Sequence, residues 1–198
     1  RGARVLCVDL DPQGNTAVHL GVKYNASLSE LLRGQVEPSA CIYPARHNLD
    51  IIPSDRSLVK AERELWELGN LRVARRVLSD KLRNADDNYS YIIVDFPPSI
   101  TLISENGLLY VNELIIPMTM SHFSVLGTQQ VIGTLKAVSR IPNHSIPNHG
   151  IPNHGIPNKG THNLCTSDTH STSRMGMAVL IPSYTTLFST FLFPYLLG

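Results

Sequence analysis

Two short apolar runs in this chain each lead to an aspartate, and they constrain the fold more than any other feature. Residues 4–8 lead to Asp9, and residues 91–94 lead to Asp95. Apolar runs of this length are typical of strands buried on both faces of a parallel sheet. Longer segments with apolar residues at helical spacing separate them, as helices between parallel strands require. We therefore expect an α/β fold of three layers, in which helices cover both faces of a mostly parallel sheet.

The other expected elements follow the same alternation. Further strands are expected at residues 49–53 and 114–118, and helices at residues 57–83, 102–111 and 126–139. Gly69 and Asn70 favour a break in the first helix, because glycine and asparagine commonly terminate helices. This pattern extends from residue 1 to about residue 140, which is long enough for one domain with a sizeable core.

The chain changes character at residue 141. Residues 141–160 read IPNHS-IPNHG-IPNHG-IPNKG, four copies of a five-residue unit. A proline in every unit excludes a regular helix, and folded repeats are longer, at ~20–50 residues. We interpret the repeat as a disordered tract; weak metal binding by His144, His149 and His154 is the alternative.

Residues 161–198 are expected to lie outside the domain core. Residues 161–174 are polar and hydroxyl-rich, like a linker, and residues 177–198 carry no charge and many apolar side chains. The tail is nearly long enough to span a bilayer, but Pro182, Pro194 and a cluster of Ser and Thr residues argue against a membrane helix. We expect a non-native apolar tail and no membrane partner.

The amino-acid composition excludes few classes of function. The net charge of +1 offers no global argument for nucleic acid binding, although a local basic patch is compatible with it. Cys7, Cys41 and Cys165 have neither zinc-type nor redox-type spacing, which suits a reducing cytoplasm. The chain opens at Arg1 with a strand pattern, which we interpret as a start inside a longer protein.

Two acidic motifs carry the chemistry. In VDLDPQGN, Asp9 and Asp11 stand at the end of the first strand and before a turn. In YIIVDFPPS, a second strand delivers Asp95, and two prolines impose a rigid exit. Ligands of open α/β sheets bind at the carboxyl ends of the strands, where all three acids are expected to gather. Taken alone, each motif is also compatible with an ordinary acidic turn or strand end.

Together these segments resemble the ParA/Soj/MinD group of deviant Walker A ATPases over residues 1 to 140. GARVLCVDLDPQGNTAVHLGV resembles the second motif of the family, and the stretch from DFPPSITLISENG onward resembles its Walker B motif and the strand and helix that follow. NLDIIPSDRSLVKAERELWELG lies where such proteins place a strand and the helix behind it. The DLDPQGN form is closer to the plasmid and chromosome partition branch than to MinD. The resemblance implies an incomplete sheet of P-loop NTPase type.

The resemblance also implies a role for each matching residue, with ATP and Mg²⁺ as cofactors. Asp11 matches the catalytic acid that orients the attacking water. Asp9 and Asp95 match acids that hold Mg²⁺ through water, with Asp95 as the Walker B carboxylate. Pro97 and Pro98 match the switch segment that reports the nucleotide state, so we count them among the cofactor-binding residues.

The biology implied by the resemblance is DNA segregation. In the family, ATP closes a homodimer, the dimer binds DNA without sequence preference, and a ParB-like protein stimulates hydrolysis. These properties imply a cytoplasmic, nucleoid-associated protein that moves plasmid or chromosome cargo.

The chain also departs from the family pattern. Its 198 residues contain no phosphate-binding loop of the form KGGxGKT, and the family pattern is not recognisable after residue 140. We therefore expect no ATP hydrolysis by the chain alone. We also expect the strands ending at Asp9 and Asp95 to flank the gap left by the strand that carries this loop, with open edges that favour aggregation. The alternatives are a non-catalytic remnant, a dominant-negative partner of an intact homologue and a membrane-attached member of the family.

Overall fold

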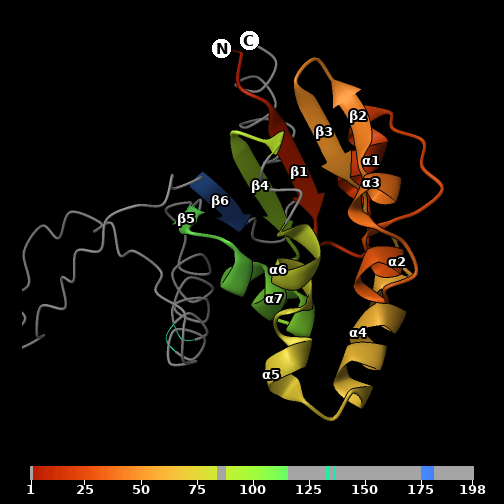
Figure 1. Ribbon diagram of the computed structural model, residues 1–198, viewed down its shortest axis with the longest axis vertical. Helices are drawn as coiled ribbons and strands as arrows, with labels where there is room; N and C mark the ends of the chain where they lie inside the picture. The colour runs from red at the N-terminus through yellow and green to blue at the C-terminus, as the bar shows by residue number, and fades with distance from the viewer. Residues whose placement is uncertain (1, 84–87, 116–132, 134–135, 137–174, 181–198) are drawn as a thin grey trace, which may run out of the picture.

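The structure is a computed structural model that describes residues 2–83, 88–115, 133, 136 and 175–180 (Figure 1). The strands are β1 (Val5–Asp9), β2 (Tyr43–Arg46), β3 (Leu49–Ile52), β4 (Tyr91–Phe96), β5 (Glu113–Ile115) and β6 (Met175–Leu180). The helices are α1 (Asn15–Leu20), α2 (Leu28–Leu32), α3 (Pro38–Cys41), α4 (Leu58–Glu67), α5 (Leu71–Ala74), α6 (Val77–Leu82) and α7 (Leu102–Tyr110). Strands and helices alternate along the described part of the chain, so the predicted α/β class is confirmed.

The strands form one sheet in the order β2-β3-β1-β4-β6-β5. All neighbouring strands run parallel except β2, which pairs antiparallel with β3 at one edge. The predicted mostly parallel sheet is therefore correct. The β2–β3 hairpin was not predicted, because β2 contains a proline and alternates between half-buried and exposed residues, as an edge strand does.

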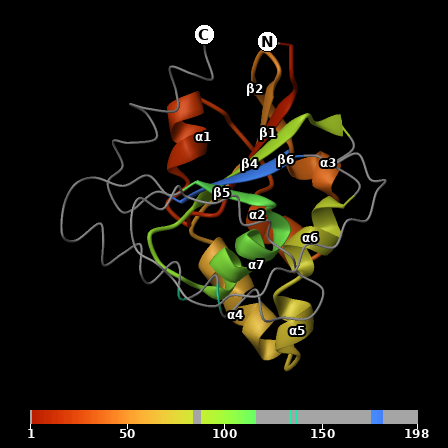
Figure 2. The same ribbon diagram turned by 90° about the vertical axis from the view of Figure 1, so that its left-hand side faces the viewer.

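Helices cover both faces of the sheet (Figures 1 and 2). On one face, Leu6 and Val8 of β1 join a large cluster of leucines from α2, α4, α6 and α7. On the other face, Cys7 packs with Ala17 and Leu20 of α1. The two clusters arise because successive side chains of a strand point to opposite faces. The three layers expected from the sequence are present, with α1 as the helix on the second face among the described residues.

The predicted break in the long helical segment is also confirmed. Gly69, with φ of +65°, lies between α4 and α5, and the Asn70 side chain accepts a hydrogen bond from Val73 N at 3.3 Å. Glycine tolerates the left-handed conformation, and asparagine satisfies a free amide at the start of α5. The chain therefore turns back on itself here and forms a helical hairpin at the end of the molecule farthest from the amino ends of the strands (Figure 1).

Two expectations about the sheet are wrong. First, β1 and β4 are not separated by a gap, because they pair directly from Val5 opposite Tyr91 to Asp9 opposite Asp95. Both strands are paired on their other sides as well, β1 with β3 and β4 with β6. Second, the tail does not lie wholly outside the domain, because β6 occupies an internal position between β4 and β5.

Several predictions fall on residues that the structure does not describe. The helix at 126–139, apart from the helical positions Gly133 and Lys136, lies outside the described residues, as do the repeat at 141–160 and most of the tail. Within the residues that are described, no helix combines the length and the apolar character needed to cross a membrane.

Candidate functional site

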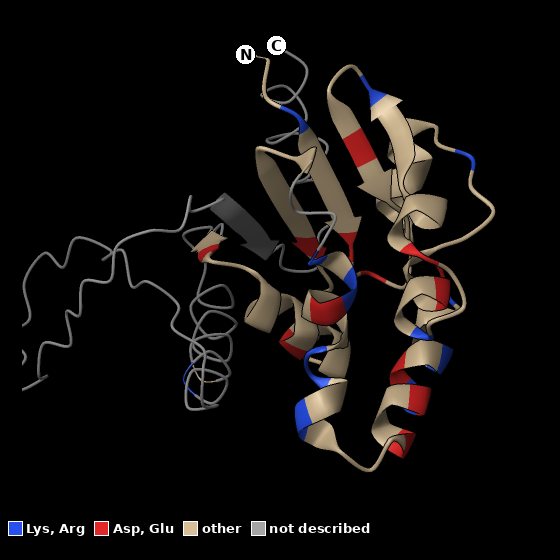
Figure 3. Cartoon of the chain, in the orientation of Figure 1, with Lys and Arg blue, Asp and Glu red and all other residues tan. Residues whose placement is uncertain are grey.

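Two carboxylates lie side by side at the carboxyl ends of the central strands. Asp9 ends β1 directly opposite Asp95 of β4. Figure 3 shows acidic positions at the carboxyl ends of these two strands. Both side chains are buried, Asp9 with 0% and Asp95 with 8% of its surface exposed. The position follows from the sequence, because each apolar run holds its strand in the centre of the sheet and the aspartate comes where the run ends.

The surroundings of this pair disfavour two negative charges. Burial raises the pKa of Asp9 to about 8, and the neighbouring charge of Asp95 contributes to this increase. Burial also raises the pKa of Asp95 to about 6, against the opposing effect of a hydrogen bond from Thr16. Desolvation favours the neutral form of a carboxyl group, and a second carboxylate nearby adds repulsion. No lysine or arginine forms an ion pair with either group among the residues described.

One oxygen of this pair lacks a hydrogen-bond partner. Asp9 Oδ1 accepts a hydrogen bond from Asp11 N at 2.9 Å, whereas the buried Asp9 Oδ2 accepts none. A buried polar atom without a partner costs about 1–3 kcal/mol, so it is rarely left in that state without a functional reason. Mg²⁺ prefers oxygen ligands and keeps several waters of its own, so two carboxylates with a spare oxygen fit such an ion.

Asp9 and Asp95 provide too few ligands to form a complete metal site by themselves. In the described part of the chain, no three His, Cys, Asp or Glu side chains are grouped so that they could hold a metal ion together. Two carboxylates that act through water, as the sequence predicted for Asp9 and Asp95, require no such cluster. The chemistry of the donors therefore fits Mg²⁺ only when water and a further ligand, such as a phosphate, complete the shell.

Asp11 lies in the turn that follows β1. Its Oδ1 accepts a hydrogen bond from Gln13 N at 2.9 Å, and its backbone oxygen accepts one from Gly14 N at 3.0 Å. These contacts are those of an aspartate that stabilises its own turn. The side chain is only half-buried, so it remains accessible to water beside the buried pair. Asp11 is therefore brought to the same edge of the sheet as Asp9 and Asp95.

Gly14 allows this turn to pass very close to the end of β3. Its φ is +64°, and a Cβ atom at this position would lie 2.3 Å from the backbone oxygen of Ser54. No other residue fits, because a side chain both strains the left-handed backbone and collides with the neighbouring chain. The Ser54 hydroxyl is buried, and it also lacks a hydrogen-bond partner. The edge of the sheet thus holds a second unsatisfied oxygen next to the turn.

Thr16 is a site residue that the motif reasoning missed. Its Oγ1 donates a hydrogen bond of 2.9 Å to Asp95 Oδ2, and the contact joins residues 79 positions apart. Thr16 lies in the first turn of α1, so the helix after the first motif holds the acid of the second motif. The only signal in the sequence was a hydroxyl residue directly after the DLDPQGN turn.

Pro97 and Pro98 leave the sheet directly after Asp95. Pro97 is buried and Pro98 is exposed, so the chain emerges from the core within two residues. The exit leads to Thr101, whose side chain caps α7, and Leu102 N donates a hydrogen bond of 2.7 Å to Glu62 of α4. The predicted switch segment therefore connects the carboxylate pair to the start of α7 and to the α4 helix.

With this geometry established, comparisons with known proteins define the class. A family model described as an AAA domain matches residues 1–147. The chromosome-partitioning ATPase Soj of Treponema pallidum is 32% identical over 138 residues, which cover 69% of this chain and 53% of the relative. The sporulation initiation inhibitor protein Soj of Bacillus subtilis is 32% identical over 145 residues, or 70% of this chain and 55% of the relative.

Solved structures agree with this class. Apo McdA from Cyanothece has a TM-score of 0.65 and 30% identity, with 71% of this chain and 56% of that chain covered. Cobyrinic acid a,c-diamide synthase from Mycobacterium smegmatis, with a bound ATP analogue and magnesium, has a TM-score of 0.63 and 32% identity. That comparison covers 72% of this chain and 58% of that chain.

The fold and the matches define an α/β protein of P-loop NTPase type. The chain belongs to this AAA-domain family, and within it the chain is similar to the ParA/Soj-type partition ATPases. The resemblance inferred from the two acidic motifs is therefore confirmed. The chain spans about half the length of the curated relatives that it matches.

Proposed function

We propose that this chain supplies the carboxylate half of a ParA-type ATP site in a DNA-partitioning system. The observation that carries the proposal is the buried, in-register pair of Asp9 and Asp95, with an unpartnered oxygen on Asp9. When bound, Mg²⁺-ATP would supply the positive charge that the pair lacks and the phosphates on which the reaction takes place.

The roles we propose for the residues follow from their positions. Asp9 and Asp95 hold the waters of the Mg²⁺ shell, and the Thr16 hydroxyl fixes the orientation of Asp95 by its hydrogen bond. Asp11, half-buried beside them, orients the attacking water. Pro97 and Pro98 transmit the state of the site to α7, because they lie in the segment that runs from Asp95 to the capped start of that helix.

The proposed activity is limited by the phosphate-binding part of the site. No Gly-rich segment with a lysine of the family form occurs in the 198 residues. That loop provides the backbone amides and the lysine that stabilise the phosphate charge, and a comparable cationic group is worth several powers of ten in rate. We therefore propose that the chain binds Mg²⁺ and does not hydrolyse ATP alone.

The wider role is proposed from the family. It comprises an ATP-dependent homodimer, binding to DNA without sequence preference, stimulation by a ParB-like protein, and a cytoplasmic location at the nucleoid. A non-catalytic remnant and a dominant-negative partner of an intact homologue remain the alternative functions. A pull-down with an intact ParA-type protein distinguishes the second alternative, because only a partner is retained.

Metal binding and turnover test the central proposal separately. We expect calorimetry at pH 8 to detect binding when preformed Mg²⁺-ATP or Mn²⁺-ATP is titrated into the protein, after subtraction of the same titration into buffer, and both Asp9→Asn and Asp95→Asn to abolish this binding. Asp50→Asn, at the opposite end of the sheet, is the control and leaves binding unchanged. Equal binding by all three variants would refute the carboxylate site, and Mg²⁺-dependent turnover that is lost in Asp11→Ala would refute the proposed inactivity.

A further inference from the structure

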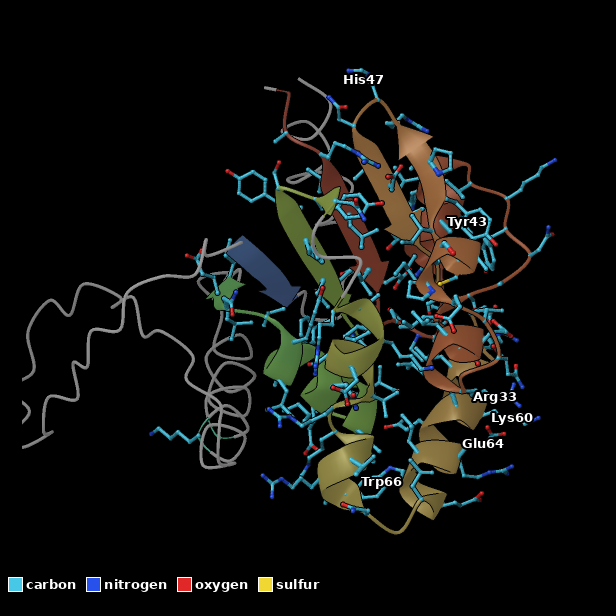
Figure 4. The ribbon with its side chains drawn as sticks, viewed as in Figure 1. Arg33, Tyr43, His47, Lys60, Glu64 and Trp66 are labelled. Atoms are coloured by element: carbon cyan, nitrogen blue, oxygen red, sulfur yellow. The ribbon has the colours of Figure 1, made fainter. Side chains whose placement is uncertain are left out.

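An exposed apolar surface lies at the helical hairpin, away from the carboxylates. It comprises Trp66, Leu68, Leu71 and Val73, which we call the helical tip, and Figure 4 labels Trp66 there. Trp66 is 55% exposed, Leu68 is 54% exposed and Val73 is 50% exposed. Single exposed apolar residues are ordinary, but four within eight consecutive positions of one helical hairpin concentrate exposed apolar surface there, as interaction sites do.

The charge around the helical tip is positive. Residues 66–76 contain three arginines and one glutamate, which is an excess of 3 − 1 = +2. Arg75 is paired with Glu105 at 2.7 Å, and Glu67 is paired with Arg63 at 3.5 Å. Arg72 and Arg76 form no ion pair with any residue that the structure describes. The segment that carries the apolar patch thus also carries two arginines without an ion pair in the described part of the chain.

The size of the patch restricts what can cover it. Four side chains that are already about half buried can bury at most on the order of a few hundred Å², whereas a stable interface between two proteins buries ~800 Å² on each partner. The patch is therefore too small for a stable dimer of this chain. A single short segment of a partner fits it better, in the manner of an amphipathic helix whose apolar residues dock on a groove or patch.

The charge pattern also disfavours nucleic acid. The glutamates of α4 add no free negative charge, because Glu64 pairs with Arg33, Glu67 pairs with Arg63, and Glu62 accepts the hydrogen bond from Leu102 N. The tip itself offers only Arg72 and Arg76 as cations outside the ion pairs of the described residues. Interfaces with DNA are far more positively charged and less apolar than this surface. Arginines next to aromatic and aliphatic side chains instead suit a protein segment that combines carboxylates with apolar residues.

The tip is linked to the switch segment through α4. Glu62 lies one helical turn before Trp66, and its Oε1 accepts the hydrogen bond from Leu102 N at the start of α7. A partner bound at the tip would therefore contact the same helix that holds the segment after Pro97 and Pro98.

We propose that the helical tip is a docking site for an acidic, amphipathic segment of a partner protein. The four apolar side chains bury the apolar face of the segment, while Arg72 and Arg76 pair with its carboxylates. The site is separate from the carboxylate pair, and it does not depend on nucleotide chemistry.

Trp66 makes the test direct, because it is the only tryptophan of the chain. The probe is a synthetic helical peptide of about 18 residues with leucines on one face and glutamates on the other. We expect it to shift the Trp66 emission to the blue in a saturable manner. A matched peptide with lysines in place of the glutamates should bind at least about tenfold more weakly, because like charges then face one another.

Variants of the tip separate the contribution of the arginines to peptide binding from that of the apolar side chains. Arg72→Glu with Arg76→Glu should weaken the glutamate peptide about tenfold or more, whereas Arg56→Glu, an exposed arginine outside the tip, should not. Leu68→Ser with Val73→Ser should abolish the shift, whereas Val18→Ser on α1 should not. If the arginine variant does not fold, rising salt must weaken binding of the glutamate peptide to the unaltered protein. No shift, equal binding of both peptides, or a larger shift with duplex DNA would overturn the proposal.

Discussion

The two ends of the central strands differ in whether their charged side chains are paired with an opposite charge. At the amino end, Arg4 donates to Asp50 at 2.9 Å, Tyr89 Oη donates to the same carboxylate oxygen at 2.8 Å, and the Arg4 guanidinium lies 5.0 Å from the centre of the Tyr89 ring. At the carboxyl end, Asp9 and Asp95 lie opposite each other, and neither forms an ion pair with a lysine or arginine that the structure describes. The carboxylate at the amino end therefore has a cationic partner, whereas the two carboxylates at the carboxyl end have none among the described residues. This difference supports the proposed role of the carboxyl end in binding Mg²⁺.

The largest expected effect is a dependence of stability on pH at the carboxyl end. The pKa of Asp9 is about 8 in the folded protein and 3.8 ordinarily, so folding holds a proton that the unfolded chain releases. The contribution of Asp9 to the free energy of unfolding is therefore fully present below about pH 4 and is lost as the pH rises through about 8. Each pKa unit corresponds to about 1.4 kcal/mol, so the loss from Asp9 is on the order of several kcal/mol. Asp95, with a pKa of about 6, adds to the loss between pH 4 and 6.

Urea unfolding at intervals from pH 4 to 8 measures this dependence. Asp9→Asn should flatten the curve, and Mg²⁺ with ATP should raise stability at pH 8 in the unaltered protein, because a ligand that binds the folded state stabilises it. Asp50→Asn at the amino end should leave the slope unchanged. If the stability of the unaltered protein stays constant over this range, the inference that Asp9 and Asp95 are buried without a cationic partner is contradicted.

The second effect concerns β6, which closes the side of β4 next to Asp95. Ala178 of β6 lies opposite Val94 of β4 and Leu114 of β5. Ala178→Pro removes a backbone donor from an internal strand, and we expect a loss of about 3 kcal/mol in the free energy of unfolding. Ala178→Ser keeps the donor and serves as the control. If the proline variant unfolds like the control, the tail contributes nothing to the sheet and our original expectation for this segment holds.

The third effect tests the close approach at the turn of the carboxyl end. Gly14→Ala places a Cβ atom 2.3 Å from Ser54 O in a left-handed backbone, and we expect a loss of about 2–3 kcal/mol. Gly21→Ala is a matched control, because Gly21 has φ of +68° and no atom within 4 Å of the added Cβ. Its loss should be about 1 kcal/mol. Thermal unfolding of both variants gives the difference, and equal losses would show that contact with Ser54 is unimportant.

The strands that end at Asp9 and Asp95 were predictable because their signal is local. A continuous apolar run identifies a buried strand without knowledge of its neighbours, and the aspartate after it is found at the same time. The break at Gly69 and the helix at α7 were predictable for the same reason. These local patterns were sufficient to place Asp9, Asp11 and Asp95 at one edge of the sheet.

The order of the strands was not predictable, because it is a long-range property. Nothing in VLCVD or YIIVD specifies that these two strands pair with each other rather than with a strand between them. The contact of Thr16 with Asp95 depends on that order and spans 79 positions, so it was missed as well. β6 was missed because an apolar tail without charge is equally compatible with a strand and with a segment outside the core.

The smallest effects are expected at the amino end, where the charges are already paired. Arg4 is 52% exposed and Asp50 is 18% exposed, so the ion pair is partly screened by water. Arg4→Ala should cost about 0.5–1 kcal/mol, and Tyr89→Phe, which removes one hydrogen bond, should cost about 1 kcal/mol. A double-mutant cycle with Asp50→Asn should give a coupling energy below about 1 kcal/mol that declines with salt. If this coupling instead exceeded the effect of Asp9→Asn at pH 8, the amino end would dominate the electrostatics of the sheet, and the contrast between its two ends would be reversed.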